Sequence, residues 1–217
     1  MIFIVFDMNK INKFLFTFSV CALFLCFVGA SGSMMGQESK KEALVGPARN
    51  EAVQKISQAT LKVRNMACKF VQTKQSSMLQ QPVEQRGEMQ YKAPDQLRWE
   101  YAAPEKMAFV LQGDSAFLEK NGVKSPMNNR MMKGMTSMIM GCMTGRDLFS
   151  ERDFGVKLYD EGKHYRAEMT PIRKDLKRMF SKMTILFLKS NCSVVEVKIM
   201  EKGGDSTTIQ FQPMWVK

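Results

Sequence analysis

Side chains that could catalyse a reaction are few in this chain, and their spacing matches no known catalytic motif. The single histidine, His164, lies in a predicted strand with no Ser-His-Asp or Cys-His arrangement around it. No H-E-x-x-H sequence, phosphate-binding loop or paired metal-ligand spacing is present. Four acidic residues flank a predicted strand, where we expect solvated loop charges rather than a catalytic pair: Glu151, Asp153, Asp160 and Glu161. We therefore expect no enzymatic activity, no catalytic residue and no cofactor.

Methionines provide the other chemistry that the sequence suggests. Six of them lie between Met131 and Met143, and apolar residues recur there at helical spacing. Thioether sulfur binds Cu(I), but apart from Cys142 no His-rich or Cys-rich tract accompanies the cluster, so we expect no metal. Methionine also moulds to irregular apolar shapes, which suits either plain core packing or a surface for varied apolar ligands. A helix that is apolar on most sides needs burial on more than one side.

The N-terminus predicts export. Lys10 and Lys13 precede an apolar run over residues 14–28, and small residues follow at 29–33. This pattern is typical of a signal peptide, which we place at residues 1–30. The run is shorter than the roughly 20 residues of a membrane-spanning helix, although an uncleaved anchor stays an alternative.

Neither cysteine of the apolar run, Cys21 or Cys26, follows a small residue as a lipid-modified cysteine would. We therefore expect a soluble exported product. Met1 and Met8 are both possible starts. Polar and small residues without a period then predict a flexible leader over residues 31–46.

Three cysteines follow the predicted signal peptide: Cys68, Cys142 and Cys192. They are far apart and form no C-x-x-C motif, so no disulfide framework is predicted. Three buried thiols are the simplest interpretation. One bridge, such as Cys142 with Cys192, stays an alternative in an oxidising compartment.

The remaining residues, 47–217, predict one mainly β domain. Helical spacing of apolar residues after Pro47 predicts an amphipathic helix over 48–64. Ten short segments with two-residue alternation or apolar runs predict strands: 66–70, 84–92, 97–101, 107–112, 116–119, 156–159, 165–170, 178–188, 192–200 and 207–212. Asn121-Gly122 predicts a hairpin turn. We expect one strongly curved antiparallel sheet, with the first helix and the methionine-rich helix over its concave side.

The composition and net charge of the chain indicate which classes of partner it can bind. Hydrophobic residues make up 45% and charged residues 24% of the chain, which is globular composition, and the formal net charge is +11. A basic protein is attracted to anionic lipid, nucleic acid or acidic protein. Trp99, Tyr91 and Tyr101 could stack on bases, but export removes the chain from nucleic acid and no basic run exceeds two residues. We expect no nucleic-acid partner.

The segment from Gly87 to Tyr101 resembles the periplasmic outer-membrane lipoprotein carrier protein family (LolA-like), through its G-x-x-x-Y-x-x-P and R-W-x-Y motifs. Phe70-Val71-Gln72-Thr73-Lys74 is similar to the family's first strand, in which a Phe precedes a Gln and a Lys. The order of elements, from signal peptide through helix and meander to long C-terminal strands, is shared as well. The resemblance covers roughly residues 48–212.

This resemblance implies an incomplete antiparallel β-barrel with a helical lid over a hydrophobic cavity. It implies a carrier or chaperone in the periplasm of a Gram-negative bacterium, which takes acylated lipoproteins from an inner-membrane donor toward an outer-membrane acceptor. The partners are then lipoproteins or other acylated ligands, with transient contacts to membranes or membrane proteins, and we expect a monomer. An acyl chain needs such a cavity, because moving each methylene group out of water is favourable by about 0.8 kcal/mol.

Alternation places one set of strand side chains toward this cavity: Met89, Tyr91, Leu97, Trp99, Tyr101, Phe109, Leu111 and Phe117. The lid candidates are the helical stripe Met131, Met135, Met138, Ile139 and Cys142. Some relatives hold the lid with an Arg just before the Pro of the turn. Ala93 stands there in this chain, with Lys92 beside it, and Arg98 is predicted to point away, so the existence of a latch stays open.

Two other functions are compatible with the same fold. A periplasmic interaction or scaffold module would have no open cavity, because its own side chains would fill the space under the lid. An enzyme acting on lipid would need a nucleophile and a base facing the cavity, and the sequence offers no credible pair.

Overall fold

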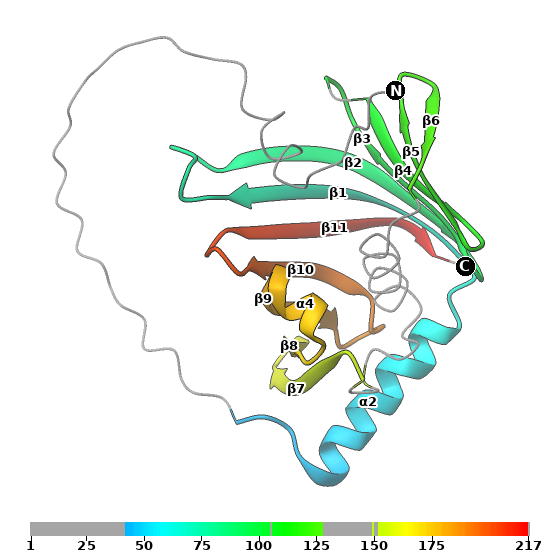
Figure 1. Cartoon of the computed structure of the whole chain (residues 1–217). Coiled ribbons are helices and arrows are strands. Elements are labelled where there is room, and N and C mark those ends of the chain that lie inside the picture. Colours follow the sequence, from blue (N-terminus) through cyan, green and yellow to red (C-terminus); the bar gives the residue numbers. More distant parts are fainter. Residues whose placement is uncertain (1–41, 105, 128–148, 150–151, 217) are drawn as a thin grey trace, which may run out of the picture. The chain divides into compact units, whose positions relative to one another are not determined.

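In the residues that the structure describes, the chain folds into one large antiparallel β-sheet with two helices (Figure 1). The computed structural model describes residues 42–104, 106–127, 149 and 152–216, all of which belong to one compact unit. The predicted signal peptide, the leader up to residue 41 and the predicted lid stripe lie outside the described residues.

In this part of the chain the helices are α2 (Gly46–Leu61) and α4 (Lys174–Met179). The strands are β1 (Asn65–Gln75), β2 (Val83–Lys92), β3 (Gln96–Tyr101), β4 (Met107–Gln112), β5 (Ser115–Lys120), β6 (Val123–Pro126), β7 (Phe154–Glu161), β8 (His164–Pro171), β9 (Phe180–Leu188), β10 (Val194–Glu201) and β11 (Ser206–Val216).

The first strand of the sequence, β1, lies in the middle of the sheet. The strand order is β6-β5-β4-β3-β2-β1-β11-β10-β9-β8-β7, so the chain builds outward from β1 to one edge, resumes at the other edge and returns beside β1. Every neighbouring pair is antiparallel. The predicted fold class, a mainly β chain with one curved and unclosed antiparallel sheet, is confirmed.

Two local predictions need correction. The structure has an eleventh strand, β6, whose four residues are all exposed and therefore show no apolar alternation. The strand predicted from residue 178 begins instead at Phe180, because Lys174–Met179 forms α4. Asp175 in the first turn and Arg178 in the last suit the dipole of this short helix.

Helix α2 packs against one face of the sheet, which we call the inner face. Pro47 occupies the first turn, as predicted, and Ala52, Ile56 and Thr60 are buried at four-residue spacing. Ala52 and Ile56 join a first apolar cluster with side chains of β7 to β10 and of α4. Neither helix in the described residues is long and apolar enough to cross a bilayer.

The register makes the inner face continuous across this half of the sheet. Cross-strand partners share a face, and one row runs from β7 to β11 through apolar residues only: Leu158, Ala167, Ile185, Val197 and Ile209. All but Ile209 are buried below one tenth exposure. This half of the inner face, together with α2, forms a closed hydrophobic core.

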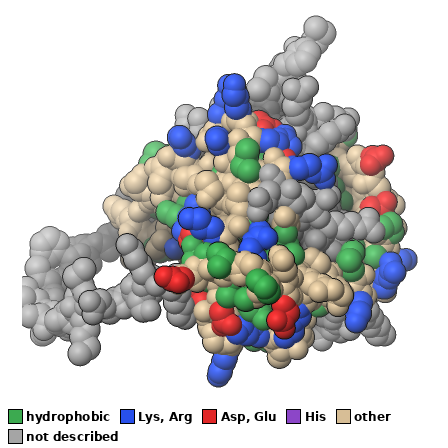
Figure 2. Space-filling model, turned by 90° about the horizontal axis from the view of Figure 1, so that it is seen from below, with side chains coloured by type: hydrophobic (Ala, Val, Ile, Leu, Met, Phe, Trp, Pro, Cys, Tyr) green, Lys and Arg blue, Asp and Glu red, His purple; other side chains and the backbone are tan. Residues whose placement is uncertain are grey.

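Charged side chains occupy the opposite, outer face. Arg166 Nε lies 2.7 Å from Glu161 Oε1, and Arg166 Nη1 lies 2.9 Å from Glu168 Oε2; Lys182 also pairs with Glu168. Such partly exposed pairs stabilise by only about 0–1 kcal/mol each. Figure 2 shows Lys and Arg side chains spread over the face seen there, with Asp and Glu among them.

Gly87 is a point of close approach within the sheet. It lies in β2 between Phe70 of β1 and Tyr101 of β3. A Cβ atom at Gly87 would lie 2.1 Å from the Glu100 carbonyl oxygen and 2.4 Å from Phe70 Cζ. The Glu100 oxygen belongs to the paired backbone of β3 and has little room to move. Glycine is therefore required for the buried Phe70 ring to occupy this space.

We expect Gly87→Ala to lower the free energy of unfolding by about 3 kcal/mol, because the added methyl overpacks the sheet. Urea unfolding followed by far-UV circular dichroism measures the change. Gly155→Ala is the matched control: Gly155 is also a strand glycine, but its Cβ would meet nothing closer than the Thr170 carbonyl oxygen at 3.9 Å. An equal loss in both variants would contradict the steric explanation.

Candidate functional site

The inner face carries a second apolar cluster, on the other half of the sheet. Its buried members all come from β1 to β5: Cys68, Phe70, Met89, Tyr91, Leu97, Trp99, Leu111 and Ala116. In the part of the chain that the structure describes, no hydrophobic residue of α2 or α4 packs against this cluster. This second cluster is the candidate site, because most of the predicted cavity residues lie in it.

Register aligns the second cluster in rows across the strands. Cys68, Met89, Trp99 and Phe109 are successive cross-strand partners from β1 to β4. A neighbouring row joins Met66, Tyr91, Leu97, Leu111 and Ala116 from β1 to β5. These rows form an apolar strip with no charged member.

Aromatic rings pack closely at the centre of the site. The Phe70 and Trp99 ring centroids are 4.3 Å apart, and the Tyr101 ring meets Phe70 edge-on at 5.4 Å. The ring of Phe211, from β11, meets Trp99 edge-on at 5.9 Å. We call these four residues the aromatic cluster. Ring pairs of this geometry stabilise by about 0.5–1.5 kcal/mol beyond the area that they bury, and they hold the Trp99 indole in one orientation.

Two polar groups lie within the aromatic cluster. The Tyr101 hydroxyl donates to Gln72 Oε1 at 3.0 Å, and burial raises the pKa of this phenol. The buried Trp99 indole N–H, directed at this hydroxyl, and the bond with Gln72 partly offset the rise in the pKa.

The register places seven of the eight predicted cavity residues on the inner face. Met89, Tyr91, Leu97, Trp99 and Leu111 are buried in the second cluster, and Tyr101 and Phe109 pack against it half-buried. Their role in binding a ligand stays a prediction.

The assignment of Phe117 to this face is wrong. Its cross-strand partner is Val110, which in turn pairs with Arg98 on the outer face. Ala116 and Leu118 occupy the inner positions of β5 instead, because they pair with Leu111 and Phe109.

Sequence reasoning omitted Cys68 and Phe70 from the site, although their alternation in the first strand was visible. The missing information was the pairing of β1 with both β2 and β11, which brings Phe70 beside Trp99 and Phe211.

The family model of the outer membrane lipoprotein carrier protein LolA matches residues 61–215. The chain belongs to this family. No curated protein matches it closely enough to count as a relative.

Solved structures with a similar fold include three that are distant in sequence. A LolA superfamily protein from Nitrosomonas europaea has 9% identity and a TM-score of 0.38, with 75% of this chain and 90% of that chain covered. An outer membrane lipoprotein-sorting protein domain from Vibrio parahaemolyticus has 10% identity and a TM-score of 0.41, with 76% and 90% covered. The lipoprotein LppX of Mycobacterium tuberculosis has 13% identity and a TM-score of 0.45, with 77% and 95% covered.

The lid that the LolA resemblance implies falls on Met131, Met135, Met138, Ile139 and Cys142, which are outside the described residues. At the position of the family's latch, Ala93 is half-buried against the second cluster and Lys92 is exposed.

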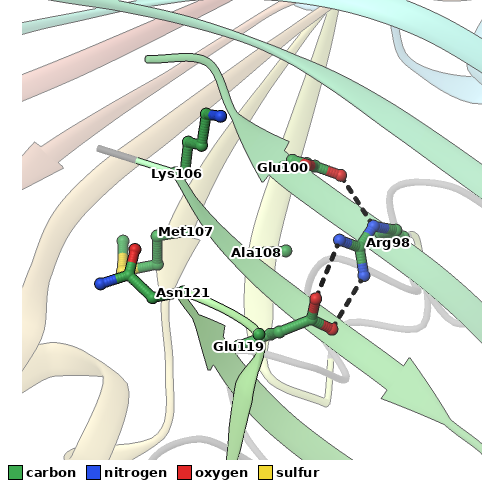
Figure 3. Close-up of a pocket in the computed structure, with 8 residues that line it drawn as sticks. Arg98, Glu100, Lys106, Met107, Ala108, Glu119 and Asn121 are labelled. Carbon is green, nitrogen blue, oxygen red and sulfur yellow. Dashed lines mark hydrogen bonds and ion pairs between the residues drawn. The ribbon is translucent and has the colours of Figure 1, made fainter. Parts of the chain in front are cut away.

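Arg98 points away from the site, as predicted. It lies on the outer face, where Nε donates to Glu100 at 2.8 Å and Nη1 donates to Glu119 at 3.1 Å (Figure 3). Ala108 stands between these two carboxylates in the register and is small enough to let Arg98 reach across β4. The hydrogen bonds to Glu119 and Glu100 raise the pKa of Arg98 above its ordinary value.

A polar hollow of about 250 Å³ adjoins this ion-paired group on the outer face, lined by Arg98, Glu100, Lys106, Met107, Ala108, Glu119, Asn121 and Gly122. Its arginine is already held by two carboxylates, so the hollow offers no unpaired guanidinium to an anion.

Candidate catalytic groups are not assembled at the site. His164 begins β8 on the outer face, paired with Leu188. Asp153 and Glu161 accept hydrogen bonds from Arg173 and Arg166, while Glu151 lies outside the described residues. Within the described ranges no three His, Cys, Asp or Glu side chains are grouped as a metal site would require.

The thiols near the core are poor nucleophiles. Cys68 and Cys192 are both free and buried. Burial raises the pKa of Cys68 to about 12 and also raises the pKa of Cys192. A reactive cysteine needs a lowered pKa, since the thiolate is the nucleophile. These two cysteines are therefore packing residues of the two clusters.

We expect Cys68 to resist alkylation by iodoacetamide near pH 8, because a pKa of about 12 leaves about one thiol in ten thousand ionised. Peptide mass spectrometry after native labelling, compared with labelling in urea, resolves each cysteine. Rapid native alkylation of Cys68 would mean that the second cluster opens readily to solvent.

Proposed function

We propose that this chain is a periplasmic carrier that binds the acyl chains of lipoproteins, or of a related lipid, on the second cluster and ferries them toward the outer membrane. One observation supports the proposal: the inner face of β1 to β5 carries an apolar cluster with no charged member among its described residues, in a member of the lipoprotein carrier family. Ligand sites are typically apolar and concave, with few polar groups, and the second cluster has that composition.

The energetic demand on a carrier supports this assignment. An acyl chain that crosses an aqueous compartment must be shielded from water, because burying each methylene group is favourable by about 0.8 kcal/mol. The carrier must also be able to release the chain. A preformed sheet supplies the apolar surface without refolding, since the strands are held by backbone pairing on both sides of β1. The basic charge of the chain suits approach to anionic lipid surfaces.

We propose that the chain is a binding protein without enzymatic activity. The indole and phenol of the aromatic cluster are hydrogen-bonding groups, and the Cys68 thiol is held protonated by burial. Export through residues 1–30, monomeric carriage and exchange with an inner-membrane donor and an outer-membrane acceptor belong to the same proposal.

Substitutions of two phenylalanines on adjacent strands test which face of the sheet binds the ligand. Phe109 and Phe117 are both half-buried, but Phe109 lies on the inner face and Phe117 on the outer face. We expect Phe109→Asp to weaken binding of a fluorescent fatty acid at least about ten-fold, because it places a carboxylate in the apolar strip. Phe117→Asp is expected to change the affinity by less than about two-fold.

Fluorescence titration of the folded variants, checked by circular dichroism, measures these affinities. Equal loss in both variants would place the binding elsewhere. Native mass spectrometry of protein purified from its host gives an independent test. No bound lipid or lipopeptide, together with no fatty-acid binding, would favour the interaction or scaffold module instead.

A further inference from the structure

We propose that one end of the sheet docks on an anionic lipid surface. This end is formed by α4, the β10–β11 turn at residues 202–205 and the β1–β2 loop at residues 76–82 (Figure 1), and we call it the α4 end. The contact holds the protein at a membrane without using the second cluster. The inference therefore goes beyond the proposed acyl binding and does not depend on it.

Hydrogen bonds join the three segments of the α4 end. The Lys202 N–H of the β10–β11 turn donates to the carbonyl oxygen of Met179, the last residue of α4, at 3.1 Å. From the other side of the turn, Asp205 Oδ1 accepts the Ser77 N–H of the β1–β2 loop at 3.3 Å. Segments that are far apart in the sequence therefore present their side chains on one continuous surface.

The α4 end carries basic side chains that no carboxylate neutralises. Four of them are exposed and make no hydrogen bond or ion pair with other described residues: Lys174, Lys177, Arg178 and Lys202. A cation that is already paired has lost most of its attraction for a further anion, whereas an unpaired one keeps it. These four residues are therefore available to an external anion.

The described acidic side chains of the α4 end are already engaged. Each has a partner in the structure: Asp153 and Asp175 with Arg173, Glu201 with Lys74, Glu84 with Arg86, and Asp205 with the Ser77 N–H. Over residues 74–86, 152–153, 171–178 and 201–206, eight basic residues stand against five acidic ones. The α4 end therefore keeps a net charge of +3.

Two apolar side chains protrude near these cations. Met78, in the β1–β2 loop, is 70% exposed, and Ile172, two residues before α4, is 45% exposed. Single exposed apolar residues are common on protein surfaces. Binding at a membrane surface, however, combines cations with apolar side chains that enter the headgroup region, and the α4 end supplies both.

The types of cation favour a lipid surface over an acidic protein. Three of the four unpaired cations are lysines, whose ammonium group acts as a point charge, whereas fixed recognition of a carboxylate favours the planar fork of arginine. Lipid phosphates spread over a bilayer require no fixed geometry. Each Lys or Arg close to an anionic bilayer raises the affinity about five-fold.

Co-sedimentation with lipid vesicles tests the proposal. We expect the protein to bind vesicles of phosphatidylglycerol and phosphatidylcholine in equal parts, and to bind pure phosphatidylcholine vesicles much more weakly. Lys177→Gln combined with Arg178→Gln is expected to weaken binding to the anionic vesicles about twenty-five-fold, because two cations are lost. Lys174→Gln combined with Lys202→Gln is expected to have the same effect and leaves the last turn of α4 unchanged.

Lys62→Gln combined with Arg64→Gln is the matched control. Both residues are exposed, and the pair removes one lysine and one arginine, as at α4. They precede β1, whereas the β1–β2 loop follows this strand of 11 residues, so about 35 Å separates the two ends. That distance is several times the Debye length of about 8 Å. The control is therefore expected to weaken vesicle binding less than about two-fold.

Circular dichroism and urea unfolding check that each variant is folded. Equal weakening by the α4 pairs and the control pair would mean that only the net charge matters, and would overturn the α4 end as the docking surface. No binding to anionic vesicles would overturn the lipid partner. Binding to polyglutamate instead, lost on Lys177→Gln with Arg178→Gln, would then assign the surface to an acidic protein.

Phe109→Asp separates this inference from the carrier function. It is expected to weaken fatty-acid binding but to leave vesicle binding unchanged, because Phe109 lies on the inner face away from the α4 end. Vesicle binding that is lost in Phe109→Asp and kept in both α4 pairs would show that the second cluster meets the lipid, and the α4 end would be wrong. Vesicle binding without fatty-acid binding would overturn the carrier function alone.

Discussion

The structure depends on one constraint: an antiparallel strand presents alternate side chains to opposite faces, and eleven strands in one sheet add their apolar halves together. The inner face therefore carries an apolar cluster on each half of the sheet. Eleven strands span about 50 Å across the sheet at about 4.8 Å per strand, whereas one helix is about 10 Å wide. Helix α2 therefore packs against the β7 to β10 half, with Ala52 and Ile56 in the first cluster.

The two halves of the inner face also differ in the side chains that fill them. The α2 half is filled largely by aliphatic side chains such as Leu158, Ile185 and Val197. The other half concentrates its rings around β1, where Phe70 touches Trp99 and Tyr101. Gly87 is the residue that allows this packing, since any larger side chain would meet Phe70 and the backbone of β3. Rigid rings on a paired backbone make a surface that keeps its shape without ligand.

A carrier has to combine strong shielding with release, and the observed features divide these tasks. Broad apolar area gives affinity that grows with chain length and is nearly independent of ligand identity. On the outer face Arg98, Glu100 and Glu119 neutralise one another, and the second cluster has no charged member among its described residues.

The sequence by itself determined which side chains of each strand share a face, because alternation is a local property of extended backbone. Met89 with Tyr91, and Leu97 with Trp99, are placed together by this rule alone, and helical spacing likewise identified α2 and its buried Ile56. Alternation could not relate one strand to the next at β5, where the hairpin register sends Phe117 outward. Local pattern was also too weak for the exposed β6 and the six-residue α4.

Only the tertiary structure decided how distant segments meet. The pairing of β1 with β11 joins residues more than a hundred positions apart, such as Phe70 and Phe211, and no periodicity within either strand indicates the other. That pairing brings the Phe211 ring against Trp99 and so completes the aromatic cluster. The half of the sheet that α2 covers was likewise set by packing, because the helix has one apolar stripe and the inner face offers it two apolar clusters.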